Sequence, residues 1–414
     1  MKYQNDTLMK TKVFFLVSML LLAGSLILSC SSRQNEKSSV KQDEIKRDTL
    51  QIINLSGVSY KDSHAKLSDF AASISYIPLS DDKLIGDISQ LCLSDNKFFI
   101  RCGTIIEVFT SEGAYIKPLF KKGNGPEETI CLERFICNDE QKIITFPAFG
   151  DFLYSYDFDG NFIRRENNSI NDRYKKIIGY QDFLRFYTLS APTPVIGQSS
   201  NIYGDTLLYG ENFENNQIIF SQENPCKEVK VTYNGIIAEL ENADFVTGKL
   251  DSCFWFRNLF MDTLYLFNKD KRQFLPKYAF NLGDHVWDLE TYMHLYYMDK
   301  DYLNQLDSKT FLQELFLGKN MLVYKLKKSG KEGVGVYSLV EQKNITFSNN
   351  IFENDLDSYL KKIDLSQALL NGYCDGEFLY FPVQAYMFFE EGNKPFSSNI
   401  TNDSNPIIVK VKLK

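Results

Sequence analysis

Two consecutive stretches of the chain repeat the same order of apolar runs and turns. Residues 88–119 and residues 134–166 each hold four short apolar runs separated by polar or glycine-containing turns. Hairpin turns favour Asp, Asn and Gly because their central positions often need positive φ. The turn segments are 94–97 and 111–113 in the first stretch, and 138–141 and 158–161 in the second. Four short strands joined by hairpins, recurring about every 45 residues, are the signature of a β-propeller blade.

Weaker copies of this pattern follow along the chain. They cover 183–190 with 205–221, then 252–282, then 321–347, then 372–389, and the chain ends in an apolar run at 406–413. The 33 Phe and 24 Tyr support this interpretation, because aromatic residues favour strands over helices. The sequence therefore predicts an all-β fold over residues 50–414, a six-bladed β-propeller of four-stranded antiparallel blades.

One stretch, at about 285–318, breaks the pattern. Its apolar residues fall at helical spacing, namely Trp287, Leu289, Tyr292, Leu295 and Tyr296. Ser308 can cap a second short helix over Lys309–Leu317, which would stop at Gly318. We expect a small helical insert between blades, with its aromatic face used for packing.

The N-terminus carries an export signal. Residues 13–28 form an apolar run after Lys10 and Lys12, and the run leads into Ile27-Leu28-Ser29-Cys30. The run has the length of a secretory signal and is short for a spanning helix. This order resembles the bacterial lipobox, in which the cysteine is lipidated and becomes the first residue of the mature protein. We expect a signal peptide at 1–29 and lipidation at Cys30; the alternative is an uncleaved membrane anchor.

The residues around this signal hold two further predictions. Asp6 is an acid in a region that should be basic, so translation starting at Met9 is an alternative to Met1. Residues 30–49 are polar and predict a flexible tether. Asp-Thr-Leu at 48–50 resembles short O-glycosylation sites of exported bacterial proteins, which makes Thr49 a candidate. The same triplet recurs at 205–207 and 262–264, where a repeated strand start explains it.

Charge and cysteine content narrow the classes of partner. The net charge of −7 argues against nucleic acid, since phosphate binding needs a basic surface. Besides Cys30 there are seven cysteines, at 92, 102, 131, 137, 226, 253 and 374. They form no CxxC or zinc-type spacing, and most lie in apolar runs. We expect small buried residues rather than a disulfide framework.

Four landmarks in order give the chain a family resemblance. They are Ser75-Tyr76-Ile77-Pro78-Leu79, the loop from Lys121 to Glu128, the hairpin 156–163 and the ending 405–413. After a lipobox, this order resembles the six-bladed β-propeller lipoproteins of gut-type Gram-negative anaerobes, with a propeller architecture like that of TolB and NHL proteins. The resemblance implies a propeller anchored at the outer membrane or cell surface and no single activity. The chain departs from the family where Glu127 replaces a glycine and Thr129 replaces an aromatic residue.

One loop is a candidate ligand site. Gly123, Asn124 and Gly125 could form a backbone nest for an anion, helped by Lys121 and Lys122. No Walker-type lysine or helix follows them. The alternative interpretation is an inter-blade turn that needs glycine for its backbone geometry.

Motifs for catalysis or metal binding are not found in the sequence. The three histidines, His64, His285 and His294, have no zinc-type spacing, and no nucleophile motif is present. The acidic segment 157–161 lacks the later glutamate of a calcium loop and is read as a hairpin turn. The sequence therefore predicts no catalytic residue, no metal and no cofactor.

These observations favour a binding or scaffold module over an enzyme. We expect a lipid-anchored protein of the cell envelope, at the outer membrane, with its periplasmic or surface orientation left open. The expected partners are the membrane, through the lipid, and an envelope protein or glycan. Two alternatives stay open: a channel-centred enzyme such as a lyase or lactonase-like hydrolase, and a subunit that docks through the helical insert. Three or more convergent Asp, Glu, Asn or His side chains in the channel would favour the enzyme, whereas a channel plugged by Phe and Tyr would favour binding through the faces.

Overall fold

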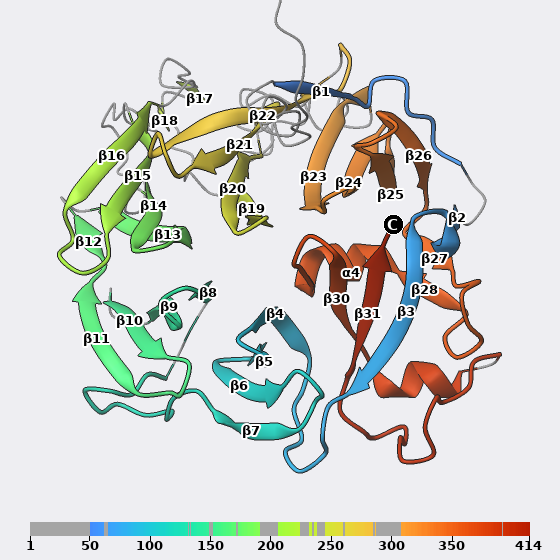
Figure 1. The fold of residues 1–414 in the computed structure, drawn as a ribbon, viewed down its shortest axis with the longest axis horizontal. Coiled ribbons are helices and arrows are strands. Elements are labelled where there is room, and N and C mark those ends of the chain that lie inside the picture. The colour runs from blue at the N-terminus through green and yellow to red at the C-terminus, as the bar shows by residue number, and fades with distance from the viewer. Residues whose placement is uncertain are drawn as a thin grey trace, which may run out of the picture. The chain divides into compact units, whose positions relative to one another are not determined.

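The described residues form β-sheets arranged in a ring (Figure 1). The structure is a computed structural model, and residues Thr49–Lys414 form one unit by their internal contacts. It describes residues 50–61, 65–130, 132, 134–148, 152–170, 173–190, 206–223, 232–233, 236–237, 245–259, 261–284, 286, 308–390 and 392–414. The predicted class, an all-β propeller with antiparallel blades, is confirmed.

The first three sheets follow the repeats seen in the sequence. The first sheet contains β4 (Ile88–Ser94), β5 (Lys97–Cys102), β6 (Ile105–Thr110) and β7 (Tyr115–Pro118). The second sheet contains β8 (Ile136–Asn138), β9 (Ile143–Ala148), β10 (Phe152–Asp157) and β11 (Phe162–Asn167). The third sheet contains β12 (Ser169–Ile170), β13 (Arg173–Gln181), β14 (Leu184–Ser190), β15 (Thr206–Asn212) and β16 (Ile218–Glu223). Their turns need glycine where expected. Gly160 between β10 and β11 has φ +74°, and a Cβ there would lie 2.4 Å from the Leu119 carbonyl oxygen.

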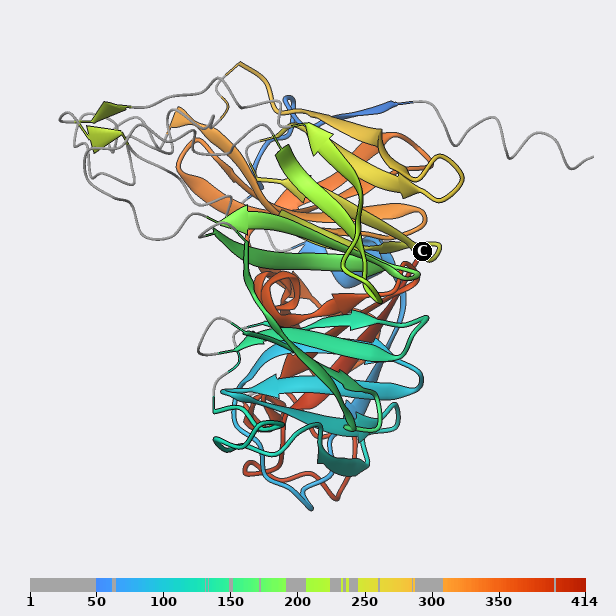
Figure 2. The same ribbon diagram turned by 90° about the vertical axis from the view of Figure 1, so that its left-hand side faces the viewer.

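Three further sheets of four or five strands continue the ring. The fourth sheet contains β19 (Phe245–Leu250), β20 (Cys253–Asn258), β21 (Thr263–Asn268), β22 (Gln273–Asn281) and β1 (Gln51–Asn54). The fifth sheet contains β23 (Thr310–Leu317), β24 (Met321–Lys328), β25 (Lys331–Ser338) and β26 (Lys343–Ser348). The last sheet contains β29 (Tyr373–Cys374), β30 (Phe378–Val383), β31 (Ile407–Leu413) and β3 (Ala71–Pro78). Strands β17 (Thr232–Tyr233) and β18 (Ile236–Ile237) form a separate pair. Consecutive sheets lie side by side in both Figure 1 and Figure 2.

A seventh sheet lies between the fifth and the last, so the predicted count of six blades is wrong. It contains β2 (Ala65–Lys66), β27 (Ile351–Glu353) and β28 (Lys362–Asp364). Helix α4 (Leu365–Asn371) follows β28 directly and contacts β23 on one side and β30 on the other. Within the described residues, seven sheets therefore have three or more strands. The seventh sheet could not be recognised in the sequence, because its strands are two or three residues long and one of them comes from the distant N-terminal side.

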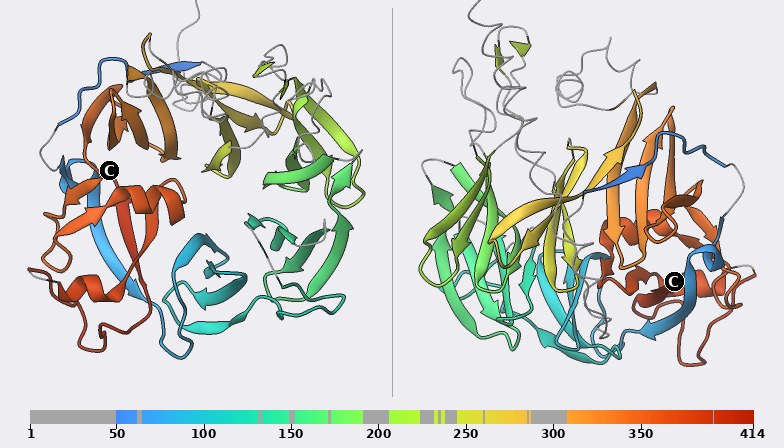
Figure 3. Two further views of the ribbon diagram at one scale, coloured as in Figure 1. Left: turned by 180° about the vertical axis from the view of Figure 1, so that it is seen from behind. Right: turned by 45° about the horizontal axis from the view of Figure 1, so that its top comes forward.

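The two ends of the described chain close the ring. In the last sheet, β31 at the C-terminal end pairs antiparallel with β3 from the N-terminal side, over Ala71–Pro78. Figure 3 shows these two strands side by side from behind, β3 in blue and β31 in red. β1 also crosses over, pairing parallel with β22 at the outer edge of the fourth sheet. Two 3-10 helices are next to strands of the last sheet in sequence: η1 (Leu67–Asp69) precedes β3, and η3 (Ala385–Phe389) lies between β30 and β31.

An apolar cluster lies between each pair of neighbouring large sheets. The pairs share clusters around Phe146 (first and second), Tyr180 (second and third), Phe186 (third and fourth), Leu322 (fourth and fifth) and Ile408 (last and first). The largest cluster joins the fifth, seventh and last sheets, with α4. Phe186 shows the packing: it is fully buried, with the Phe254 ring centroid 5.1 Å away. Burying one such side chain contributes about 1.5–3 kcal/mol.

The predicted helix over Lys309–Leu317 is wrong, because Thr310–Leu317 is strand β23. A β-bulge between Leu312 and Glu314 explains the error. The bulge shifts the buried positions from Leu312 to Leu315, a spacing of three that imitates a helix. Residues 287–307 of the predicted insert lie outside the described residues.

Several sequence predictions fall on residues that the structure does not describe. These are the signal peptide, Cys30, the tether and Thr49, together with His64, His285 and His294. In the part of the chain that is described, no helix has the length and apolar character needed to cross a membrane.

Candidate functional site

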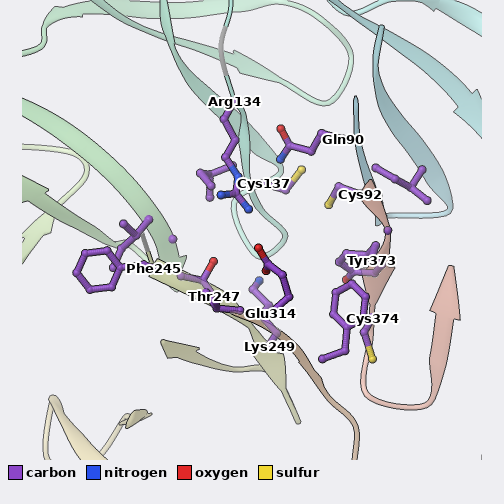
Figure 4. A pocket seen from close by; sticks show the side chains of 18 of the residues that line it. Gln90, Cys92, Arg134, Cys137, Phe245, Thr247, Lys249, Glu314, Tyr373 and Cys374 are labelled. Carbon is purple, nitrogen blue, oxygen red and sulfur yellow. The ribbon is translucent and has the colours of Figure 1, made fainter. Parts of the chain in front are cut away.

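The innermost strands of the ring enclose a cavity of about 640 Å³. Its walls come from β4, β8, β13, β19 and β23, with the end of α4 and β29 completing them. Each of these strands presents alternate side chains to one face. Figure 4 shows that the side chains lining this cavity are both polar and aromatic. A cavity of this size lies within the range of small-molecule sites.

One arginine in the cavity has its backbone fixed by a neighbouring strand. The Gln90 side chain on β4 donates to the Phe135 carbonyl oxygen at 2.6 Å and accepts from the Phe135 amide at 3.1 Å. These two hydrogen bonds hold the backbone of Phe135, the residue beside Arg134. Arg134 itself is exposed within the cavity lining, and no ion pair or hydrogen bond to it occurs among the described residues. Arg134 therefore offers a planar guanidinium from a held stretch of backbone, and such a group suits a carboxylate.

The other two cations of the lining, Arg101 and Lys249, already have partners: Arg101 donates to the Ser89 hydroxyl at 2.8 Å. Lys249 on β19 forms an ion pair with Asp139, which follows β8, and both line the cavity. Glu314 at the β23 bulge is the other carboxylate of the lining. The bulge places this side chain on the cavity side, although its strand otherwise buries alternate leucines.

Aromatic residues form another part of the wall. Trp255 lies flat over Gly248 across the strand pair, where a Cβ would come within 2.6 Å of the indole ring. Tyr373 on β29 also faces the cavity. Burial, and then the nearby Cys92 and Asp139, raise the pKa of Tyr373 well above its usual value, so its hydroxyl stays a neutral donor. Aromatic faces beside polar groups are typical of sites for small organic ligands.

Three thiols also line this cavity, from Cys92, Cys137 and Cys374. Cys374 is buried, whereas Cys92, Cys102, Cys137 and Cys253 are half-buried. All five are free thiols; Cys131 and Cys226 lie outside the described residues. Four of the five are thus less enclosed than the sequence predicted, and for Cys92 and Cys137 the reason is that their inner strands border a cavity.

The cavity lining includes three side chains of the kinds that would favour an enzyme, namely Asp139, Glu314 and Asn371. Within the described residues, no three or more His, Cys, Asp or Glu side chains are grouped so that they could hold a metal ion. Asp139 is already paired with Lys249. The cavity therefore has an open wall in which these three polar side chains accompany aromatic ones, and one of the three is already held in an ion pair.

The loop predicted to bind an anion lies away from this cavity and holds a carboxylate of its own chain. The Gly125 amide donates to Glu128 Oε2 at 3.0 Å, and Lys121 Nζ lies 3.0 Å from Glu128 Oε1. A Cβ at Gly123 would lie 2.0 Å from Glu128 Oε2, so glycine is needed to admit the carboxylate. Hydrogen bonds from Lys121 and Gly125 lower the pKa of Glu128. Asn124 and Lys122 are exposed beside it.

The acidic segment 157–161 connects β10 to β11 as a turn. Asp157 accepts hydrogen bonds from the backbone amides of Asp159 and Asn161, at 2.9 and 2.8 Å. Its carboxylate is thus used to hold the hairpin.

Sequence reasoning missed the cavity residues Arg134, Lys249, Glu314 and Tyr373. Each lies on or next to a different inner strand, and no local spacing relates them. One weak signal existed: Arg134 stands at the start of a repeat, where an inner strand begins.

Comparison with known proteins gives a family and a fold. A solved structure of a protein described as exported, from Bacteroides fragilis, has a TM-score of 0.61 at 14% identity, covering 88% of this chain and 100% of that one. A member of the DUF4221 family from Bacteroides vulgatus has a TM-score of 0.48 at 11% identity, covering 83% of this chain and 97% of that one. No protein with a curated description matches. The first likeness shows a shared fold.

A family model covers nearly the whole described unit. It is described as a domain of unknown function, DUF4934, and matches residues 50–412. This agrees with the propeller family that the sequence resembles, apart from the count of blades, while lipidation stays a prediction. Since the match spans far more than half of the sequence, the chain belongs to the DUF4934 family.

Proposed function

We propose that this protein is a lipid-anchored binding module of the cell envelope that holds a small carboxylate-bearing ligand in its central cavity. The observation that carries the proposal is Arg134, an exposed cation of the cavity lining with no partner among the described residues. Guanidinium groups bind carboxylates through two parallel hydrogen bonds. The envelope location rests on the lipobox at Cys30 and on likeness to a protein described as exported.

The wall around Arg134 supports a ligand that is both polar and ring-bearing. Tyr373 and Thr247 offer hydroxyl groups, and Phe245 offers an aromatic edge. Uronic acids combine a carboxylate with hydroxyls on a ring, so they fit this chemistry and the expected glycan partner. A ligand of one or two such rings suits a cavity of about 640 Å³.

The test uses a matched pair of sugars that differ at one group. D-galacturonate should raise the melting temperature of the purified protein, and D-galactose should not, because only the first carries a carboxylate for Arg134. A ligand at 100 times its dissociation constant stabilises by about 2.7 kcal/mol, which a thermal shift detects. Arg134→Ala should lose the shift.

Lys121→Ala is the matched control, since Lys121 is an exposed cation outside the cavity. It should keep the response to galacturonate. An equal response to both sugars, or an unchanged response in Arg134→Ala, would overturn the role given to Arg134. A response lost only in Lys121→Ala would move the site to the loop 121–125.

The enzyme alternative is a second proposal, supported by Asp139, Glu314 and Asn371 in the cavity lining. It would need Glu314 or Asp139 to act on a substrate beside Arg134. Docking through the insert at about 285–318 rests on residues that lie mostly outside the described part of the chain.

A further inference from the structure

Two thiols face each other where the first sheet meets the second. Cys92 lies on β4 and Cys137 on β8, and both line the cavity. Figure 4 shows the two sulfur atoms pointing toward one another across the gap between these strands. Both side chains also pack on the same apolar cluster between the two sheets.

The register of the two strands explains this placement. The Gln90 side chain is bonded to both backbone polar groups of Phe135, so these residues lie opposite one another. Cys92 and Cys137 each follow two residues later, and residues two apart point to the same face of a strand. The Gln90 clamp therefore brings the thiols into neighbouring positions.

The environment distinguishes the two thiols chemically. Burial, and then the adjacent Cys92, raise the pKa of Cys137 well above its usual value. The thiolate is the attacking form in disulfide exchange. A raised pKa leaves little of Cys137 as thiolate, so Cys137 is slow to attack an external disulfide.

We propose that Cys92 and Cys137 form a reversible disulfide that joins the first two sheets at the cavity wall. The Cys92 thiolate attacks one sulfur of an external disulfide, RSSR, and one thiolate RS⁻ leaves. The Cys137 thiolate then attacks the Cys92 sulfur, and the second RS⁻ leaves. Two protein thiols are oxidised, RSSR is reduced to two thiols, and the two protons go to the leaving groups or solvent.

This bond changes both the ring and the cavity. It closes a loop of about 45 residues, which restricts the unfolded chain. It also removes two polarisable thiols from the wall that Arg134 and Tyr373 share. The oxidised form should therefore unfold at a higher temperature and present a changed cavity wall.

Trypsin separates the relevant cysteines cleanly. Cleavage after lysine and arginine places Cys92 in peptide 84–97 and Cys137 in peptide 135–142, with Cys131 in a third peptide, 123–134. The full chain, oxidised with glutathione disulfide and alkylated before digestion, should yield 84–97 linked to 135–142. Its mass is about 2 Da below the sum of the two peptides, because two hydrogens are lost. Reduction with dithiothreitol should release both.

Cysteine-to-serine variants test whether the disulfide forms between these two thiols and not between others. Cys92→Ser and Cys137→Ser should each abolish the linked peptide and the rise in melting temperature on oxidation. Cys102→Ser should retain both, since burial raises the pKa of Cys102 to about 12 and it lines no part of the cavity. If 84–97 and 135–142 remain fully alkylated after oxidation, or if either links to 123–134 instead, the proposal is wrong. These outcomes do not depend on whether galacturonate binds.

Discussion

At the scale of single residues, buried charged side chains link the second sheet to the third. Arg185 on β14 has a fully buried side chain, and its guanidinium contacts Glu166 on β11 at 2.7 Å and also Glu211 on β15. Lys175 lies 2.8 Å from the other Glu211 oxygen. Removing one partner of such a group leaves a buried charge without compensation, which costs about 3–5 kcal/mol. The network is therefore specific to the pairing of these two sheets.

Glu166 gives this network a predicted pH dependence. Burial alone would raise the pKa of Glu166, but hydrogen bonds from Arg185 and the charges of Arg185 and Arg164 lower it below its usual value of 4.5. A lowered folded pKa means stability that is complete above the usual value and lost as the pH falls through the folded one. Glu166→Gln should cost about 2 kcal/mol at pH 7, the value of a charge-assisted hydrogen bond. Urea unfolding should show this difference shrinking below about pH 4.5.

An exposed ion pair provides the comparison. Glu341 pairs with Lys343 at 2.9 Å, and both side chains are more than half exposed. Glu341→Gln should change the free energy of unfolding by at most about 1 kcal/mol. A loss in Glu166→Gln that stays constant down to pH 3 would contradict the prediction.

At the scale of elements, the sequence predicted the strands that follow regular alternation and end in hairpin turns. It did not predict the β-bulge or the pairing of distant strands. The repeats at 88–119 and 134–166 became the first two sheets because their hairpins are local in sequence. The bulge at Leu312–Glu314 was not readable, since one extra residue turns strand spacing into helix-like spacing. The seventh sheet was missed because β2 pairs with β27, which lies almost 300 residues away.

Helix α4 gives a prediction at this scale. Asp364 caps it by accepting from the Ser366 amide at 2.9 Å. Asp364→Ala should lower the free energy of unfolding by about 1 kcal/mol, because the cap satisfies an otherwise free amide. Asp364→Asn should change it little, since asparagine caps equally well. Equal losses in both variants, measured by urea unfolding, would show that the charge and not the cap matters.

At the scale of the whole molecule, stability depends on closing the ring. β31 pairs with β30 and with β3, so the last sheet joins the C-terminal strand to a strand from near the N-terminal end of the described residues. Without β31, the edges of β3 and β30 would expose unpaired backbone groups. The two apolar clusters to which β31 contributes would also be exposed.

Deleting residues 407–414 should therefore abolish cooperative unfolding. The expected result is loss of the thermal transition by circular dichroism and rapid cleavage by trypsin, because β3 and β30 lose their common partner. Lys412→Ala is the control, since Lys412 is exposed on the same strand and should melt like the wild type. A deleted chain that still melts in one sharp transition would show that closure is not required.

The sequence by itself determined the blade pattern of this protein, because hairpin turns and strand alternation act over a few residues. It also identified Lys121 and Gly123 as unusual, although their loop proves to hold Glu128 of the same chain. Only the tertiary structure decided the seventh sheet and the cavity. It alone placed Arg134 in the cavity lining, with no partner among the described residues, and Cys92 beside Cys137. Ring closure brings together strands that no local spacing relates.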